Sequence, residues 1–492
     1  MDRQPKHNQN TTVNPIEHLY FWARVRPDDV AIQRLTGTVT WRELLLRVRG
    51  VACKLRRMGL QPNQIVMTWL NSQPDWIVTL ALIHEGVISC ATPGVFPGEL
   101  NVDWVLSGRP LPPLPSSRTI SVDDAWLDDL PQVPQDFRPH AFAGEDSLFR
   151  VILTSGTTGQ SKAAEFSLGS LLRRCECMSA ISNSYASELC LLRLASGFGF
   201  VLGLRRLLRG QVSYFATESE IVDLISTQGI ECLSGSPHQL GIVIGKLQGT
   251  SRRLQSLKMV WYSGVVASPL LLENMRRMFC PTVVCHYGST EVGPVSYHLI
   301  HDPNHRPGIA GYVVPEVKVQ IVDDQHRPLA VGAEGTVRLQ SAFMASRYYR
   351  NPAATDQSFR DGWFYPGDRG KLLANGMLEL TGRESELINR GGAKISPVEL
   401  DSSIQNYAGI LDVATFGFEN QQGVEDICAA IVVTNDFNME AFQLHLTQTF
   451  PKHKKPSLII RLEEIPRNQM GKPLRSQMRE QFGDVLRQQQ RR

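Results

Sequence analysis

The sequence predicts an α/β protein with a largely parallel sheet, followed by a smaller and separate unit. Two patterns indicate this architecture. Helix-like and strand-like segments alternate from about residue 40, and a second, shorter alternation begins beyond residues 381–392. The length of 492 residues points the same way, because domains usually hold roughly 100–200 residues. We therefore expect a large N-terminal domain and a small C-terminal one.

The first predicted element is a helix that begins at residue 40. Thr40 and Glu43 form a capping box, and apolar residues then recur at helical spacing as far as Leu55. Gly59 is suited to cap the end of this helix. The next predicted elements are a buried strand, a helix and a second buried strand, at 64–70, 75–86 and 87–92. This alternation is typical of a parallel sheet.

The pattern changes in the middle of the chain. Residues 107–118 are rich in proline and predict a loop. Residues 121–150 carry no clear pattern, whereas residues 310–341 alternate with turn signals and predict a β-rich region.

The C-terminal unit has its own helix and strand signals. Ser396 and Glu399 predict a second capping box, with Pro397 at the first helical position. The elements predicted after it are two strands at 412–418 and 427–434 and a helix at 439–450.

The composition argues against several kinds of protein. The formal net charge is only +3, so neither nucleic acid nor an anionic membrane is expected as a partner. The nine cysteines include no CxxC pair, which argues against a zinc site. The N-terminus carries no apolar leader, and the longest apolar stretch, 76–88, is too short to span a membrane. We expect a cytoplasmic protein.

The strongest local signal is the segment LTSGTTGQSK at residues 153–162. Backbone N–H groups of such a glycine-rich loop can surround phosphate oxygens, and Lys162 adds a positive charge. The spacing is not that of a Walker A loop, because Gly156 and Gly159 are too close together and Lys162 does not follow Gly159 directly. The alternative is a flexible surface turn, which composition alone leaves open.

Five motifs, taken in order, resemble the adenylate-forming superfamily of acyl-CoA synthetases, peptide-synthetase adenylation domains and firefly-type luciferases. They are LTSGTTGQSKAAEFS (153–167), YGSTE (287–291), GWFYPGD (362–368), TGRESELINRGGAKISPVELD (381–401) and RNQMGKPLR (467–475). The similarity covers most of the chain. It implies a large N-terminal AMP-binding domain (1–382), made of α/β subdomains plus a β-subdomain, and a small mobile α+β C-terminal domain (383–492).

The resemblance implies nucleotide-binding roles for residues of these motifs. The residues implied at the β- and γ-phosphates and at the departing pyrophosphate are Thr154, Ser155, Gly156, Thr157, Thr158, Gly159 and Lys162. Tyr287 is implied against the adenine, and Asp368 and Arg383 at the ribose hydroxyls. Without the other motifs, Tyr287 would be interpreted as a core tyrosine and Asp368 as a turn residue.

Three residues are implied in the chemistry itself. Thr290 is expected at the α-phosphate, and Glu291 at a magnesium ion, a hard cation suited to carboxylate oxygen. Lys472 is expected to bridge the substrate carboxylate and the α-phosphate, where it stabilises charge in the transition state. The C-terminal domain is expected to rotate between half-reactions, so that the turn at Gly391 and Gly392 leaves room for a pantetheine arm.

The implied activity is that of an ATP-dependent carboxylic acid ligase, which forms an acyl-adenylate and then an acyl thioester with coenzyme A. The implied cofactors are ATP, Mg²⁺ and coenzyme A. One alternative is loading of the acyl group onto the phosphopantetheine of an acyl carrier protein. An alternative from another class is a non-catalytic homologue that binds nucleotide or acid. Ser161, Ala163 and Pro366 depart from the family pattern without removing an expected catalytic group.

The acid itself is the least defined part of the interpretation. Segment 192–204 holds no acidic residue that could bind a substrate amino group. This disfavours an α-amino acid and favours a fatty or aromatic acid. Phe198 and Phe200 are candidates to line the acyl pocket, and they are equally suited to a core.

Overall fold

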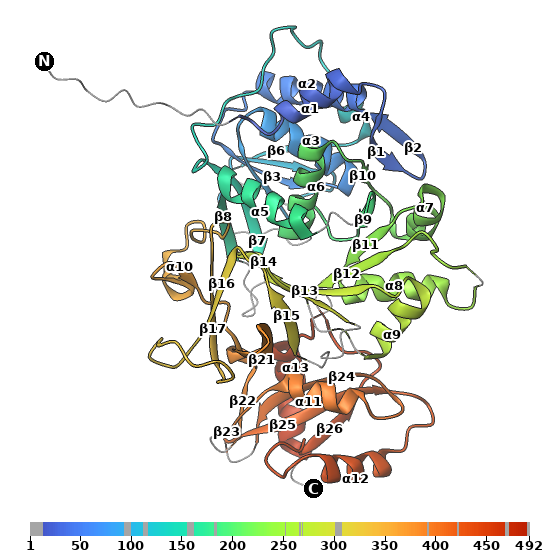
Figure 1. Cartoon of the computed structure of the whole chain (residues 1–492), viewed down its shortest axis with the longest axis vertical. Coiled ribbons are helices and arrows are strands. Elements are labelled where there is room, and N and C mark those ends of the chain that lie inside the picture. The colour runs from blue at the N-terminus through green and yellow to red at the C-terminus, as the bar shows by residue number, and fades with distance from the viewer. Residues whose placement is uncertain are drawn as a thin grey trace, which may run out of the picture.

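The computed structural model contains two large mixed sheets and a small C-terminal α/β unit (Figure 1). It describes residues 13–92, 100–111, 117–154, 162–181, 185–250, 252–264, 267, 269–300, 308–390, 393–420, 423–467 and 472–489. Among these residues, no helix is long and apolar enough to cross a membrane.

The first large sheet has the strand order β6-β5-β3-β4-β7-β8, and all its neighbours are parallel except β7 and β8. Its strands are β3 (Ile65–Trp69), β4 (Ile88–Ala91), β5 (Trp104–Ser107), β6 (Arg118–Ser121), β7 (Leu148–Thr154) and β8 (Lys162–Ser167). The helices of this part are α1 (Glu17–Val25), α2 (Trp41–Arg57), α3 (Ser72–His84), α4 (Asp124–Asp128), α5 (Leu168–Ile181) and α6 (Gly197–Arg209). A small sheet joins β1 (Val30–Arg34), β2 (Gly37–Thr40) and β10 (Ser213–Tyr214).

The second large sheet has twelve strands. Its parallel part consists of β9 (Glu188–Cys190), β11 (Cys232–Gly235), β12 (Met259–Ser263) and β13 (Val283–Ser289). Its antiparallel part consists of β14 (Gly293–Leu299), β15 (Ile309–Val313), β16 (Val317–Val322), β17 (Gly335–Ser341), β18 (Phe359–Arg360), β19 (Trp363–Phe364), β20 (Asp368–Leu372) and β21 (Met377–Arg383). The helical segments of this part are η1 (Glu218–Glu220), α7 (Ile221–Gln228), α8 (Pro237–Leu247), α9 (Pro269–Met278) and α10 (Pro352–Ser358).

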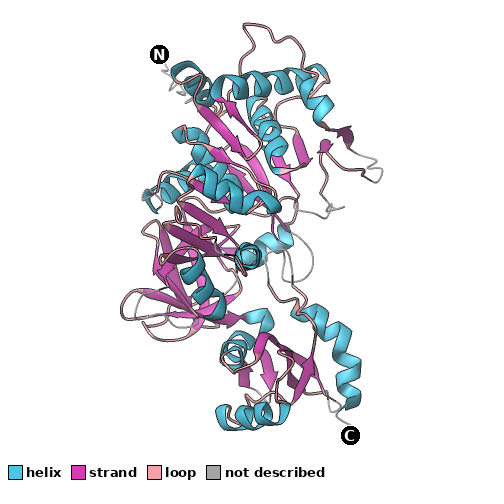
Figure 2. Ribbon diagram, turned by 90° about the vertical axis from the view of Figure 1, so that its right-hand side faces the viewer, coloured by secondary structure: helices cyan, strands magenta, loops and turns pink. Residues whose placement is uncertain are grey.

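The C-terminal elements form a group of their own, which Figure 2 shows below the twelve-stranded sheet. The short helix η2 (Glu384–Glu386) leads into this group directly after β21. Its strands are β22 (Ile388–Arg390), β23 (Ala393–Ile395), β24 (Ile410–Glu419), β25 (Glu425–Val433) and β26 (Leu458–Arg461), and its helices are α11 (Pro397–Gln405), α12 (Met439–Thr449) and α13 (Arg475–Gln489). The division at residues 382 and 383, and the mobility of the smaller part, stay predictions.

The structure confirms the predicted α/β architecture and most of the local signals. The capping box of Thr40 and Glu43 is present at the start of α2. The predicted segments 64–70, 75–86 and 87–92 correspond to β3, α3 and β4, and β3 and β4 pair in parallel as expected. The β-rich prediction for 310–341 corresponds to β15, β16 and β17.

The predicted capping box at Ser396 is wrong. Helix α11 begins at Pro397 as expected, but the Ser396 hydroxyl accepts no capping hydrogen bond. The carboxylate of Glu399 accepts a hydrogen bond from Lys454 Nζ at 2.7 Å instead of reaching back to the helix start. A Cβ atom built at Gly382 would lie 2.6 Å from Ser396 Oγ, so this hydroxyl packs directly against the end of β21.

Candidate active site

Three residues predicted at the nucleotide meet at one point of the twelve-stranded sheet, and we call them the strand cluster: Tyr287, Asp368 and Arg383. Asp368 is directly opposite Arg383 in the register of β20 and β21. The Tyr287 hydroxyl donates to Asp368 Oδ2 at 2.6 Å, and Arg383 Nε lies 3.0 Å from Asp368 Oδ1. The sheet thus brings together residues that are 81 and 15 positions from Asp368 in the sequence.

Burial and charge act in opposite directions on Asp368. Burial raises the pKa of its carboxyl group, while Arg383 and Tyr287 hold it down. Burial also raises the pKa of Tyr287 well above its ordinary value, so its hydroxyl stays a donor. An ionised carboxylate has about four acceptor positions. Asp368 therefore keeps positions for the hydroxyls of a sugar beside its two protein partners.

A second group joins the predicted phosphate lysine to the predicted metal carboxylate. The Tyr348 hydroxyl donates to Glu291 Oε1 at 2.8 Å, and Lys162 Nζ lies 5.0 Å from the centroid of the Tyr348 ring. Ala164 and Tyr348 form an isolated β-bridge, which holds this tyrosine beside β8. Sequence reasoning missed Tyr348, because its role depends on this contact and no local spacing indicates it.

The rest of the predicted phosphate loop is described only at its ends. Thr154 ends β7 and Lys162 begins β8, and the two residues face each other in the antiparallel register. Both therefore stand where the loop leaves and rejoins the first large sheet. Ser155, Gly156, Thr157, Thr158 and Gly159 lie outside the described residues, as do Gly391 and Gly392.

Arg174 holds the turn that carries Thr290 and Glu291. Its guanidinium is buried and donates to the backbone oxygens of Thr290 at 3.0 Å, Glu291 at 3.3 Å and Phe343 at 3.0 Å. The ring of Phe166 lies against the same guanidinium, with Arg174 Cζ 4.6 Å from the ring centroid. Sequence reasoning also missed Arg174, since no motif marks an arginine that donates to backbone oxygens.

The residues present fit a magnesium ion held together with nucleotide phosphates. Mg²⁺ is usually bound by one or two carboxylates plus substrate phosphates and water. Glu291 supplies a buried carboxylate of this kind, with Tyr348 on one oxygen. Within the described ranges, no cluster of three or more metal-ligating side chains offers an all-protein site.

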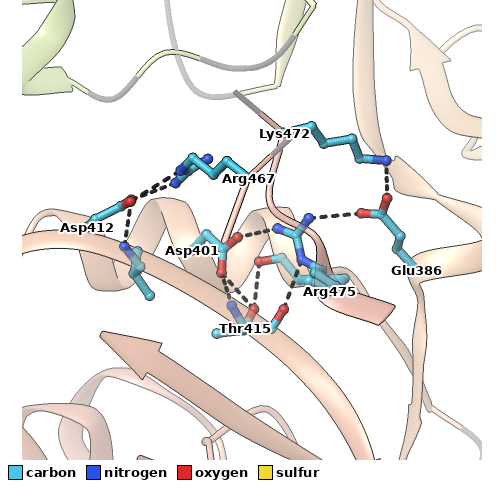
Figure 3. A network of polar contacts seen from close by, with 9 residues as sticks. Glu386, Asp401, Asp412, Thr415, Arg467, Lys472 and Arg475 are labelled. Carbon is cyan, nitrogen blue, oxygen red and sulfur yellow. Dashed lines mark hydrogen bonds and ion pairs between the residues drawn. The ribbon is translucent and has the colours of Figure 1, made fainter. Parts of the chain in front are cut away.

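Lys472 belongs to a group of charges that we call the hinge cluster: Glu386, Asp401, Lys472 and Arg475 (Figure 3). Lys472 forms an ion pair with Glu386, whose other oxygen lies 3.0 Å from Arg475 Nη1. Arg475 also pairs with Asp401 and donates from Nε to the Thr415 backbone oxygen at 2.9 Å. The contacts of this cluster therefore connect β24, inside the C-terminal unit, with η2, which follows Arg383 in the chain.

The charges of the hinge cluster depend on one another. Although burial raises the pKa of Glu386, Arg475 and Lys472 bring it below its ordinary value. Burial lowers the pKa of Lys472, and Glu386 opposes that shift. Loss of the Glu386 carboxylate would therefore make the Lys472 ammonium easier to deprotonate. Asp368 is also within electrostatic range of Lys472, so the two clusters lie near each other.

The two phenylalanines predicted for the acyl pocket occupy different surroundings. Phe200 is fully buried, and Arg150 Cζ lies 3.8 Å from its ring centroid, so Phe200 belongs to the core. Phe198 is half-buried, and its ring centroid lies 5.7 Å from that of His286. A Cβ atom at the neighbouring Gly197 would lie 3.5 Å from Thr290 Cγ2, so the start of α6 touches the predicted site.

A cavity of about 180 Å³ lies on another side of α6. Leu191, Gly203, Arg206 and Tyr214 are among its lining residues, and none of the predicted site residues lines it. The guanidinium of Arg206 is already bound, because it donates to the Glu188 backbone oxygen at 2.6 Å. The predicted nucleotide-binding residues therefore lie outside this cavity, whereas Leu192, Leu194, Gly199 and Gly203 of segment 192–204 line part of it.

Comparison with known proteins places the chain in a wider group. Residues 98–349 match the family model described as AMP-binding enzyme. Indoleacetate–CoA ligase of Aromatoleum aromaticum is 25% identical over 93% of this chain and 96% of its own length.

Solved structures agree with the fold. ATP-bound MatB from Rhodopseudomonas palustris matches with a TM-score of 0.84 at 21% identity, covering 96% of this chain and 99% of that one. O-succinylbenzoate coenzyme A synthetase (MenE) from Bacillus subtilis, in complex with ATP and magnesium ion, matches with a TM-score of 0.81 at 20% identity, covering 94% and 98%.

Proposed function

Because this chain belongs to the AMP-binding enzyme family, we propose that it activates a carboxylic acid with ATP and transfers the acyl group to coenzyme A. The resemblance to the adenylate-forming superfamily is confirmed, and the chain is an enzyme of the AMP-forming acid–CoA ligase type. The observation that carries the residue assignments is the strand cluster. Three residues taken from three separate motifs meet there in one hydrogen-bonded group.

The first half-reaction makes a poor electrophile reactive. A carboxylate cannot expel oxide, whereas the mixed anhydride with AMP has a good leaving group. The carboxylate oxygen attacks the α-phosphorus, and the bond to the departing pyrophosphate breaks. Catalysis of such a transfer is mostly positioning and charge stabilisation.

The residues of this chain divide that work. Tyr287, Asp368 and Arg383 would hold the adenosine, with Asp368 as the acceptor of ribose hydroxyl hydrogens. Thr154, Lys162 and the loop between them would hold the β- and γ-phosphates and the departing pyrophosphate, through donors and positive charge. A magnesium ion on Glu291 would supply further positive charge beside the phosphates.

Lys472 would act on the reacting groups themselves. It is a flexible, compact cation, and it rests on Glu386 close to the strand cluster. From there its ammonium would turn to the acid carboxylate and the α-phosphate, where Thr290 is also expected. Charge that builds on these oxygens in the transition state is stabilised by a positioned cation.

The acyl acceptor and the acid are the finer parts of the proposal. We infer coenzyme A as the acceptor, supported by the name of the A. aromaticum relative. We infer an aromatic or fatty acid, because segment 192–204 carries no acidic residue and the start of α6 approaches Thr290 at Gly197, one residue before Phe198.

The direct test is acid-dependent exchange of labelled pyrophosphate into ATP, across fatty, aryl, hydroxy and amino acids. Exchange with aryl or fatty acids supports the proposal, and exchange confined to α-amino acids contradicts the acid class. Free coenzyme A and a phosphopantetheinylated carrier protein are then offered in parallel to the adenylated enzyme. Thioester formation on the carrier alone would replace coenzyme A as the acceptor.

A further inference from the structure

His286 is a buried side chain whose polar atoms lack partners in the described part of the chain. The residue is 9% exposed, and neither Nδ1 nor Nε2 has a hydrogen-bond partner there. Burial lowers the pKa of His286 to about 4, so the ring is uncharged near neutral pH. A neutral imidazole offers one N–H donor and one acceptor.

A buried polar side chain without hydrogen-bond partners is unusual in a native protein. Native proteins pair the large majority of their buried polar groups, and an unpaired group in a native structure commonly marks a ligand, a water or a functional role. His286 precedes Tyr287 in the chain, so it stands beside the strand cluster. Because side chains alternate along a strand, it faces the opposite side of the sheet from Tyr287.

The neighbours of His286 form an aromatic face with a second unpaired donor. In the strand registers His286 is opposite Ser263 on β12 and Tyr297 on β14, and Trp261 lies two residues before Ser263. These four residues therefore share one face of the sheet. Trp261 is 7% exposed, and its Nε1 also lacks a partner among the described residues.

Rings surround this point on several sides. The Trp261 and Tyr297 ring centroids are 6.2 Å apart in an edge-to-face arrangement. The Phe198 ring covers His286 from α6, whose first residue touches Thr290. An acid whose carboxylate lies at Thr290 and Lys472 would therefore extend its acyl group toward this face.

We propose that His286 and Trp261 recognise an uncharged hydrogen-bonding group on an aromatic acid, such as a ring hydroxyl or a ring N–H. The inference rests on the proposed function and narrows its substrate class. The aromatic face suits an aryl acyl group, and the two unpaired side chains supply two donors and one acceptor. An uncharged imidazole does not balance a second carboxylate, so dicarboxylic acids are poorer substrates.

The expected discrimination is large. A site built to hydrogen-bond a substrate group rejects the analogue that lacks it, because the protein groups are then left unpaired. We expect kcat/KM for pyrophosphate exchange to be at least about tenfold higher for the polar member of a matched pair than for the apolar member. This is less than the largest discrimination known for sites that hydrogen-bond a substrate group. Suitable pairs are hydroxybenzoates against benzoate, hydroxycinnamates against cinnamate, and indoleacetate against naphthaleneacetate.

His286→Leu tests the assignment at the residue. It should reduce the preference for the polar member to about onefold while changing exchange with the apolar member by less than about threefold. The variant should keep the melting temperature of the wild type, because no described residue forms a hydrogen bond with the His286 ring. His286→Gln, which keeps a donor and an acceptor, should restore part of the preference.

His298→Leu is the matched control. His298 is a buried histidine on the same sheet, opposite Cys285 and so on the other face, and its replacement should leave the substrate ratio unchanged in folded protein. Equal exchange with both members of every pair by the wild type would overturn the inference and leave the proposed function standing. His286 would be a structural residue if the His286→Leu variant kept the wild-type preference for the polar member of each pair. The same conclusion would follow if the melting temperature of this variant fell strongly. Absence of exchange with every acid would overturn the proposed function itself.

Discussion

Arg383 of the strand cluster and Glu386 of the hinge cluster are only three residues apart in the sequence, yet the two clusters are held by different forces. In the strand cluster, β20 and β21 set Asp368 opposite Arg383 through backbone hydrogen bonds. In the hinge cluster, Lys472 reaches Glu386 only through a pair of charges between segments 86 residues apart in the sequence.

The two clusters differ in how easily their interactions can break during the reaction. A sheet register changes only if many backbone hydrogen bonds break together, so Asp368 stays opposite Arg383 with or without a nucleotide. The ion pair of Lys472 and Glu386 joins only two side chains, so it can break without disturbing any strand. A lysine held in that way can leave Glu386 for a phosphate, and the predicted rotation of the C-terminal domain requires such a release.

Lys472→Ala should have the largest effect, and it tests the role given to the hinge cluster. If Lys472 stabilises charge in the transition state, acyl-adenylate formation should fall by about 10²–10³-fold, as for loss of one such donor. Thioester formation from supplied acyl-adenylate should change little. Single-turnover assays of each half-reaction measure the split, with Lys454→Ala as a control because that lysine pairs with Glu399, which is not a member of the cluster. Equal losses in both half-reactions would contradict the role given to Lys472.

Asp368→Asn tests the strand cluster. The variant weakens the acceptor proposed for the ribose hydroxyls and removes the partner charge of Arg383, so ATP affinity should fall by about 30-fold, or about 2 kcal/mol. Calorimetric titration with ATP measures the change. Tyr287→Phe removes only one neutral donor and should cost about fivefold, or about 1 kcal/mol. An effect of Tyr287→Phe equal to that of Asp368→Asn would mean that the cluster is structural.

Glu386→Gln tests the hinge cluster through pH. The Lys472 ammonium acts while protonated, so adenylation is lost as pH rises through its pKa, which burial has already lowered. Without the Glu386 charge that pKa falls further, and the alkaline limit of adenylation should move to lower pH. The rate near neutral pH should fall about tenfold, equivalent to about 1.4 kcal/mol of lost positioning.

The control for this variant is Asp412→Asn, which removes the partner of Arg467 in the same C-terminal unit. It should leave the alkaline limit where it is. A limit that stays unchanged in Glu386→Gln would mean that the ion pair with Lys472 is absent when substrates are bound.

The smallest expected effect is that of Tyr348→Phe. The hydroxyl orients one oxygen of Glu291, so its loss should raise the magnesium concentration for half-maximal adenylation by about threefold, equivalent to about 0.7 kcal/mol, at the low end of the net contribution of one hydrogen bond. Magnesium titrations of the wild type and the variant measure the shift. Tyr349→Phe, at the neighbouring ring, is the control and should not alter the titration.

The sequence alone predicted the elements that depend on local pattern. The helix after Thr40 and the buried strands near residues 65 and 88 follow from capping and periodicity, and the structure has them. The box at Ser396 failed because a nearby lysine competes for Glu399, and such competition depends on tertiary contact. The predicted nucleotide residues came from motif resemblance, and their roles stay predictions.

The partners of those residues could not be predicted. Tyr348, Arg174 and Glu386 reach Glu291 or Lys472 only after the chain has folded, and their distances along the sequence carry no periodic signal. His286 is a further case, because only the folded structure reveals that its buried ring nitrogens have no hydrogen-bond partner among the described residues.

Arg174 has a consequence for anyone who exchanges segments between homologues. One guanidinium is shared by α5, the turn after β13 and the segment after β17, through three backbone oxygens. Lysine has no planar fork with which to replace it. A transplanted acyl-binding or metal-binding segment will therefore function in this chain only if its backbone oxygens meet the same three donors, so the unit of exchange must include α5.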